Sequence, residues 1–427
     1  SKKQISTKQE IKFNYGSLSN EEINTLTYKT LNGSIASVDS SGKIIGVGKG
    51  KTKIIVYSGD FNKEFDIEVV SPQISYQTHI QNYGWQNYVN NGELSGTTGK
   101  SLRLEGIKIK LDNLTYDGGI EYQTHVQNYG WQSWKSDNQM SGTSGQSLRL
   151  EGIRIRLTGE LSEHYDIYYR THTQNIGWLD WAKNGQESGS QGLSARLEGI
   201  QIQLVEKNSG NFNTSRSFVN GTNTNINYQV HVQNYGWQSY RSSGQLAGTT
   251  GESLRLEAFR SNISGTNLTG GITYQSHIQS IGWQGWKSNG ELSGTSGQSL
   301  RMEALKINLT GELSSFFDIY YRAHVQDLGW LGWAKNGSGA GSQGASKRIE
   351  AIEIRLIRKG DNAPKESNGF YIPPKVEKPR LQKINGIYYI DGLIVVNKKY
   401  SLPSNYSPGE NGEAGRAIRR MISDMQN

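Results

Sequence analysis

Six histidines recur at one position of a repeated pattern and are the first residues in this sequence that could do chemistry. Each stands three residues after a tyrosine and six residues before a tryptophan: His79, His125, His172, His231, His277 and His324. Three symmetric histidines could bind zinc on a threefold axis. However, a glutamine follows each histidine on the same strand face, and a hydrogen-bonded polar surface explains that pattern more simply. We therefore expect no metal site and no catalytic residue, and treat the six histidines as candidate binding residues.

Two aromatic positions follow each histidine. The first is a tryptophan after glycine, at Trp85, Trp131, Trp178, Trp237, Trp283 and Trp330, and the second comes three residues later, at Tyr88, Trp134, Trp181, Tyr240, Trp286 and Trp333. The first ring could fill the core of a symmetric domain or form a flat platform under a sugar. The second ring lies beside a turn, so we expect it to be partly exposed. Both positions are candidate ligand contacts.

Each copy also carries Arg-x-Glu, at Arg103/Glu105, Arg149/Glu151, Arg196/Glu198, Arg255/Glu257, Arg301/Glu303 and Arg348/Glu350. Alternation along a strand places both side chains on one face, opposite the leucines. We expect them to pair with each other or with a neighbouring strand. The alternative is that the arginine binds a sugar or a carboxylate.

The spacing of the histidines shows how the copies are grouped. Copies one to three and copies four to six are related by a shift of 152 residues, and the third copy of each half differs from the others in the same way. A chain that is duplicated in groups of three is expected to close by threes. We predict two domains, each with pseudo-threefold symmetry.

Strand signals fill every copy. Tyr76 to Gln81 alternates apolar and polar residues, and the run Leu102 to Leu111 changes phase at Glu105-Gly106, which predicts a β-bulge there. About three to four strands per copy, taken three times, predict an all-β fold that is either a β-trefoil or a three-sheeted β-prism.

The composition limits the class of protein. The chain has 427 residues, no cysteine and a net charge of +8, with basic residues dispersed along it. A disulfide scaffold and a cysteine nucleophile are excluded. The charge favours polyanions such as wall polymers. We expect no nucleic-acid partner, because no basic helix or nucleic-acid motif occurs. We also expect no membrane span, because no apolar run approaches the roughly 20 residues required. The start at Ser1 without methionine leads us to expect a mature or truncated fragment.

The Gly-Trp pairs, with the downstream Gly-Thr-x-Gly and Arg-x-Glu-x-Ile elements, resemble the ChW family, the clostridial hydrophobic repeat with a shared tryptophan. The resemblance covers residues 75–358. It implies a secreted protein on the surface or wall of a Gram-positive bacterium, where such repeats are thought to attach to polysaccharides, other surfaces or proteins.

Two further resemblances flank the repeats. Residues 1–71, with Ile35 to Gly42 and Ile45 to Val56, resemble a group 2 bacterial Ig-like domain, which implies a small β-sandwich. The stretch from Asp391 to Tyr400, followed by Leu402-Pro403 and Tyr406 to Gly409, resembles the start of a VanY-type D-alanyl-D-alanine carboxypeptidase. The family's zinc ligands lie beyond such a start, so zinc is implied only for a chain with the full domain.

We therefore expect an Ig-like sandwich at 1–71, a first triplet at 73–207, a linker at 208–225, a second triplet at 226–358, a proline-rich linker at 359–385 and a short α+β fragment at 386–427. The leading hypothesis is multivalent binding of peptidoglycan or wall polysaccharide, which would target a wall-trimming carboxypeptidase. The alternatives are the carboxypeptidase itself, with its catalytic part outside this chain, and a structural stalk or adhesion protein with surface-protein partners.

Overall fold

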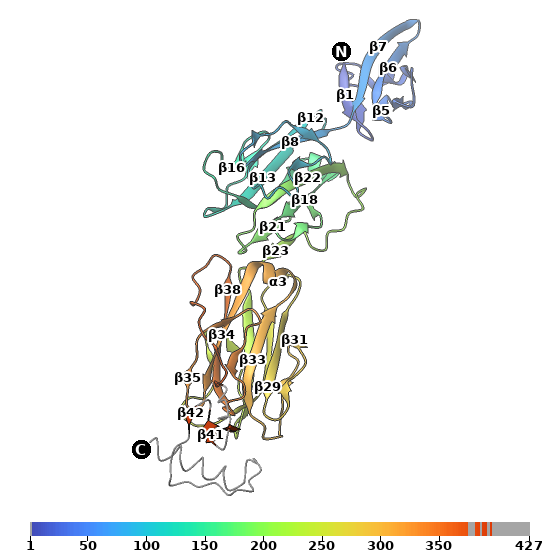
Figure 1. The fold of residues 1–427 in the computed structure, drawn as a ribbon. Coiled ribbons are helices and arrows are strands. Elements are labelled where there is room, and N and C mark those ends of the chain that lie inside the picture. Colours follow the sequence, from blue (N-terminus) through green and yellow to red (C-terminus); the bar gives the residue numbers. More distant parts are fainter. Residues whose placement is uncertain (1, 375–380, 385–386, 391–392, 395–427) are drawn as a thin grey trace. The chain divides into compact units, whose positions relative to one another are not determined.

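The computed structural model describes residues 2–374, 381–384, 387–390 and 393–394 (Figure 1). The chain begins with a sandwich of a four-stranded and a three-stranded sheet, ordered β1-β7-β6-β3 and β2-β5-β4. Its elements are β1 (Lys3–Ser6), β2 (Glu10–Lys12), α1 (Asn20–Asn24), β3 (Thr27–Thr30), β4 (Ala36–Val38), β5 (Lys43–Gly46), β6 (Gly50–Ser58) and β7 (Phe61–Val70). Ile5, Ile44, Ile54 and Ile67 are buried between the sheets. The predicted Ig-like sandwich is confirmed.

The first triplet follows as three copies of one strand pattern. Copy one contains β8 (Gln73–Ile80), β9 (Gly84–Trp85), β10 (Val89–Asn90), β11 (Ser95–Gly96) and β12 (Leu104–Asp112). Copy two contains β13 (Gly119–Val126), β14 (Gly130–Trp131), β15 (Lys135–Ser136), β16 (Ser141–Gly142) and β17 (Leu150–Thr158). After α2 (Leu161–His164), copy three contains β18 (Tyr165–Thr173), β19 (Gly177–Trp178), β20 (Ala182–Lys183), β21 (Ser188–Gln191) and β22 (Leu197–Glu206).

The second triplet repeats this order. Copy four contains β24 (Asn225–Val232), β25 (Gly236–Trp237), β26 (Arg241–Ser242), β27 (Leu246–Gly248) and β28 (Leu256–Ser264). Copy five contains β29 (Ile272–Ile278), β30 (Gly282–Trp283), β31 (Lys287–Ser288), β32 (Ser293–Gly294) and β33 (Met302–Leu309). After α3 (Gly311–Phe316), copy six contains β34 (Phe317–Val325), β35 (Gly329–Trp330), β36 (Ala334–Lys335), β37 (Ala340–Ser342) and β38 (Ile349–Arg358).

The three copies of a triplet are closed into a ring by exchange of one short strand. In the first triplet β16 of copy two pairs with β12, β21 of copy three pairs with β17, and β11 of copy one pairs with β22. The second triplet uses β32, β37 and β27 in the same way. Each triplet thus consists of three separate sheets. This is the arrangement of a β-prism and not the continuous barrel of a β-trefoil.

The exchanged strands require glycine. At Gly142, with a φ of 104°, a β-carbon would lie 2.5 Å from the carbonyl oxygen of Glu105 in the neighbouring copy. Glu105 stands at the predicted β-bulge, where the register of β12 against β8 shifts between Leu104 and Gly106. The bulge is confirmed, and the exchanged strand of the next copy lies against it.

The tyrosine that opens each copy fills the core. Tyr76, Tyr122, Tyr169, Tyr228, Tyr274 and Tyr321 are fully buried. The hydroxyl of Tyr122 donates to the carbonyl of Gln139 in its own copy and accepts from the amide of Ile109 in copy one, at 3.2 Å. Burial raises the pKa of Tyr228 to about 12, so this hydroxyl stays protonated and can donate. These tyrosines join the copies to each other through hydrogen bonds.

Each triplet is followed by a segment that adds a further strand to it. Residues 208–220 and 359–371, which we call the trailing segments, end in β23 (Phe218–Asn220) and β39 (Phe370–Tyr371). These strands run parallel to β21 and β37. Residues 208–220 and 359–371, which lie within the predicted linkers, therefore contribute to the triplets. Further along, β40 (Leu381–Ile384), β41 (Ile387–Ile390) and β42 (Leu393–Ile394) form an antiparallel sheet. Most of the carboxypeptidase-like stretch lies outside the described residues.

Candidate functional site

The first tryptophan of each copy lies on the outer face of its sheet. Its short strand pairs with the strand that carries the histidine, so that His79 stands opposite Trp85 and His125 stands opposite Trp131. In all six copies the imidazole meets the indole edge to face, with ring centroids 5.3 to 5.5 Å apart. All six of these tryptophans are half-buried. The alternative that they form the symmetric core is wrong, because the tyrosines occupy it.

A buried glutamate fixes each histidine. Nδ1 of the imidazole lies 3.0 to 3.2 Å from Oε2 of the glutamate in all six copies. That nitrogen is buried and makes no well-aligned hydrogen bond to the carboxylate. The other glutamate oxygen accepts from Nε of the arginine two residues earlier, at 2.8 to 3.0 Å. The predicted Arg-x-Glu pairing is confirmed, and the paired glutamate lies against the histidine that packs on the tryptophan.

A cation covers the face of each first tryptophan. The charged group lies 4.2 to 4.9 Å from the ring centroid, at Lys108, Arg154, Arg170, Arg260, Lys306 and Arg322. In copies one, two, four and five it comes from the long last strand and stands opposite a glutamine, as Lys108 does opposite Gln77. In copies three and six the cation lies on the first strand instead. Arg170 stands opposite Gln201 on the last strand, and Arg322 stands opposite Glu353.

The cation is therefore a property of the site and not of one sequence position. Sequence reasoning missed it, because the residues of the first and last strands were compared separately. The signal was present: the positions two residues before and 29 residues after each histidine always hold one cation between them. Such a contact contributes about 0.5–1 kcal/mol at an exposed site.

The second aromatic position differs from copy to copy. Trp181 is buried, with 9% of its surface exposed, because Phe212 of the trailing segment lies 4.8 Å from it between ring centroids. Trp333 is half-buried, and it exchanges hydrogen bonds with Ser367 of the other trailing segment. The prediction of partial exposure is wrong at Trp181 and confirmed at Trp134, at Trp333 and at the other three positions.

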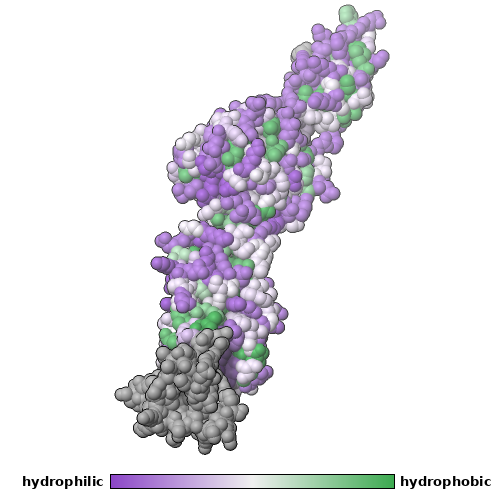
Figure 2. Space-filling model, in the orientation of Figure 1, coloured by the Kyte–Doolittle hydropathy of each residue, from purple (hydrophilic) through white to green (hydrophobic). Residues whose placement is uncertain are grey.

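Two of the three remaining rings are the most exposed in the set. Tyr240 and Trp286 have 47% and 49% of their surface exposed, against 37% for Tyr88. The face of the molecule in Figure 2 is mostly hydrophilic with scattered hydrophobic patches. Exposed aromatic rings on such a surface are available to a ligand.

The trailing segments are directed to particular edges by the residue after the first tryptophan. In copies one, two, four and five this residue is a glutamine, and its side-chain oxygen accepts from the amide of the exchanged strand, as Gln132 does from Gly142 at 2.8 Å. In copies three and six it is a leucine, Leu179 or Leu331. There the amide of Gly189 or Gly341 donates instead to a carbonyl of the trailing segment. A glutamine therefore closes the strand edge, and a leucine leaves it open to a strand.

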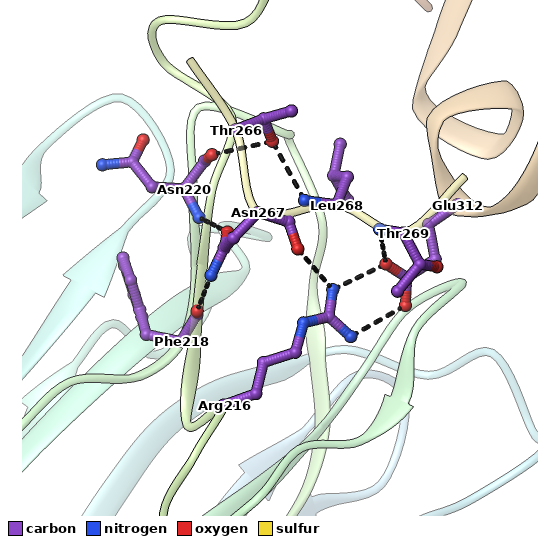
Figure 3. A network of polar contacts seen from close by, with 8 residues as sticks. All are labelled: Arg216, Phe218, Asn220, Thr266, Asn267, Leu268, Thr269 and Glu312. Atoms are coloured by element: carbon purple, nitrogen blue, oxygen red, sulfur yellow. Dashed lines mark hydrogen bonds and ion pairs between the residues drawn. The ribbon is translucent and has the colours of Figure 1, made fainter. Parts of the chain in front are cut away.

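The first trailing segment also reaches the second triplet (Figure 3). Arg216 donates to both carboxylate oxygens of Glu312 in α3, at 3.1 and 2.6 Å. The side chain of Asn267 accepts from the amide of Asn220 and donates to the carbonyl of Phe218. Burial alone would raise the pKa of Glu312, but Arg216 and the amide of Thr269 outweigh it and hold that pKa below its usual range. The two triplets are thus joined by a bidentate ion pair and backbone-like hydrogen bonds.

Metal binding has no support in the described part of the chain. No group of three or more histidine, cysteine, aspartate or glutamate residues is placed there so that it could hold a metal ion. Each of the six histidines contacts the glutamate and tryptophan of its own copy. Among the described residues, no helix has the length and apolar character needed to cross a membrane.

Each copy of this site lies in a segment that matches a known repeat family. The sequence matches the family described as Clostridial hydrophobic W at residues 79–113, 125–159, 172–206, 231–265, 277–311 and 324–358. The chain contains six clostridial hydrophobic W repeats. Residues 9–69 match the group 2 bacterial Ig-like domain, so that the resemblances to the ChW repeat and to the Ig-like domain are confirmed. No curated protein matches the chain. This combination fits a cell-surface repeat protein, and each ChW repeat runs from its histidine to the end of its long strand.

Proposed function

We propose that the six ChW repeats form a multivalent surface that binds peptidoglycan or another wall polymer of a Gram-positive bacterium. The protein would be secreted by that bacterium and held on its wall by this binding. The observation that supports this most is the outward tryptophan. The fold is closed by the buried tyrosines, yet every copy also holds a tryptophan at the surface between an oriented histidine and a cation. Six such positions give avidity for a repetitive polymer even when each contact is weak.

The experiment is a pull-down of the full chain on purified cell walls, before and after removal of the anionic wall polymer, at low and high salt. We expect saturable binding in every condition, weaker at high salt because the net charge of +8 contributes. Replacement of both Trp85 and Trp237 by alanine should reduce binding, whereas Phe61→Ala in the Ig-like domain, 82% exposed, should not. Absence of binding to either wall preparation would contradict the proposal and favour a stalk with protein partners.

The resemblance of residues 391–409 to a VanY-type carboxypeptidase adds a second part to the proposal. Repeats that hold the protein on the wall would bring such an enzyme to its stem-peptide substrate. The present chain should release no D-alanine from a stem peptide, since the family's zinc-binding motifs are not in it. Zinc-dependent release by this chain would show that interpretation to be wrong.

A further inference from the structure

The six second-aromatic rings are not equivalent, because within the described residues a cation lies over five of them and none lies over Trp286. Phe212 of the first trailing segment and the guanidinium of Arg170 cover Trp181. The guanidinium groups of Arg322 and Arg355 lie 4.7 and 5.0 Å from the Trp333 centroid. In the first triplet the other two rings carry cations: Lys110 lies 5.4 Å from the Tyr88 centroid and Arg156 lies 4.1 Å from the Trp134 centroid. In the second triplet Arg260 approaches Tyr240 only to 5.9 Å, and no cation lies over Trp286 within the described residues.

The difference between Trp134 and Trp286 lies in one cross-strand pair. Beside Trp134, Glu121 stands opposite Arg156, and Nε and one terminal nitrogen of the guanidinium donate to Glu121 at 2.9 and 2.7 Å. At the matching positions of the second triplet, 152 residues later, Thr273 stands opposite Asn308. The side chain of Asn308 accepts from the amide of Leu309 at 3.0 Å. An ion pair that covers a ring has been replaced by two short neutral groups that leave it uncovered.

The surroundings of Trp286 are open. Gly285 precedes it, and a β-carbon built there would meet no atom within 4 Å. The turn of copy six lies beside Asn308, because a β-carbon at Gly337 would be 3.8 Å from the Asn308 side chain. Lys287 follows Trp286 as Lys135 follows Trp134, so it does not distinguish the two positions.

We propose that the uncovered face of Trp286, with Thr273 and Asn308 beside it, is a binding site for a neutral pyranose ring of a glycan chain. A flat indole with neutral hydrogen-bonding groups at its side matches the two surfaces of a sugar, the apolar ring face and the hydroxyl groups. A cation over the ring, as at Trp134, occupies one face of the indole and makes that position of the first triplet charged. This inference rests on the proposed function. It places the binding of neutral sugars in the wall polymer at copy five.

The test measures binding of a neutral β-1,4-linked N-acetylglucosamine tetramer to the full chain by titration calorimetry, at low and high salt. We expect saturable binding that salt leaves unchanged. Trp286→Ala should weaken it about tenfold or more, because a stacked aromatic contact of this size is lost. Trp134→Ala is the matched control and should change it less than about twofold. Both tryptophans lie outside the tyrosine core, so both variants should fold.

A reciprocal exchange tests the cause. Asn308→Arg should cover Trp286 and weaken tetramer binding, whereas Arg156→Asn should uncover Trp134 and add a second binding site. Equal effects of Trp286→Ala and Trp134→Ala would overturn the inference. Binding of cell walls without binding of the tetramer would also overturn it while leaving the proposed function intact. Failure to bind either ligand would contradict both.

Discussion

The hydroxyl of Tyr122 is predicted to hold the first triplet together. Tyr122→Phe removes a group that donates to the Gln139 carbonyl and accepts from the Ile109 amide, and it leaves the ring in place. The Ile109 amide would then be buried without a partner, whereas Gln139 is an exposed residue. An unsatisfied buried group costs about 1–3 kcal/mol, so the variant should lose about that much. For a domain of this size that corresponds to a fall in melting temperature on the order of 10 °C.

The assay is calorimetry of the full chain combined with hydrogen exchange, which assigns the loss to the first triplet. Tyr129→Phe is the matched control, because the same hydroxyl is removed from a side chain that is 62% exposed. The control should change stability by less than about 0.5 kcal/mol. If the two variants lose the same stability, or if protection falls equally in both triplets, the role assigned to the buried tyrosines is refuted.

Two further predictions concern the first trailing segment. Glu312→Gln should cost about 1–2 kcal/mol at neutral pH by weakening the Arg216 ion pair, read as faster hydrogen exchange at residues 216–220. Because the pKa of Glu312 is lowered, its contribution in the wild type is present above pH 4.5 and is lost as the pH falls through the lowered value, where the two proteins should converge. Leu179→Gln should place an amide in competition with the Ser217 carbonyl for the Gly189 amide and release the segment, read as faster proteolysis of residues 208–217. Leu179→Met, which adds no amide, should not do so, and equal cutting of both variants would contradict the assignment.

Much of the fold followed from local patterns in the sequence. Alternation along Tyr76 to Gln81 and the phase change at Glu105-Gly106 depend on the two-residue period of a strand, so they fixed the buried face and the bulge. The Arg-x-Glu pairing follows from the same period. The shift of 152 residues established the triplets, because duplication leaves its record in the sequence whatever the contacts are.

The tertiary structure decided which aromatic residue fills the core and which rings are free. Tyr122 and Trp131 are both large and aromatic, and only the ring of exchanged strands shows that the tyrosine lies within reach of a backbone amide in the neighbouring copy. The cations over the tryptophans come from either of two strands, so their constancy is visible only when paired positions are joined across the sheet. The cover over Trp181 comes from residues 31 positions later, a separation that no local pattern encodes. Contacts between copies depend on how the chain closes in space, whereas contacts within a strand depend on its period alone.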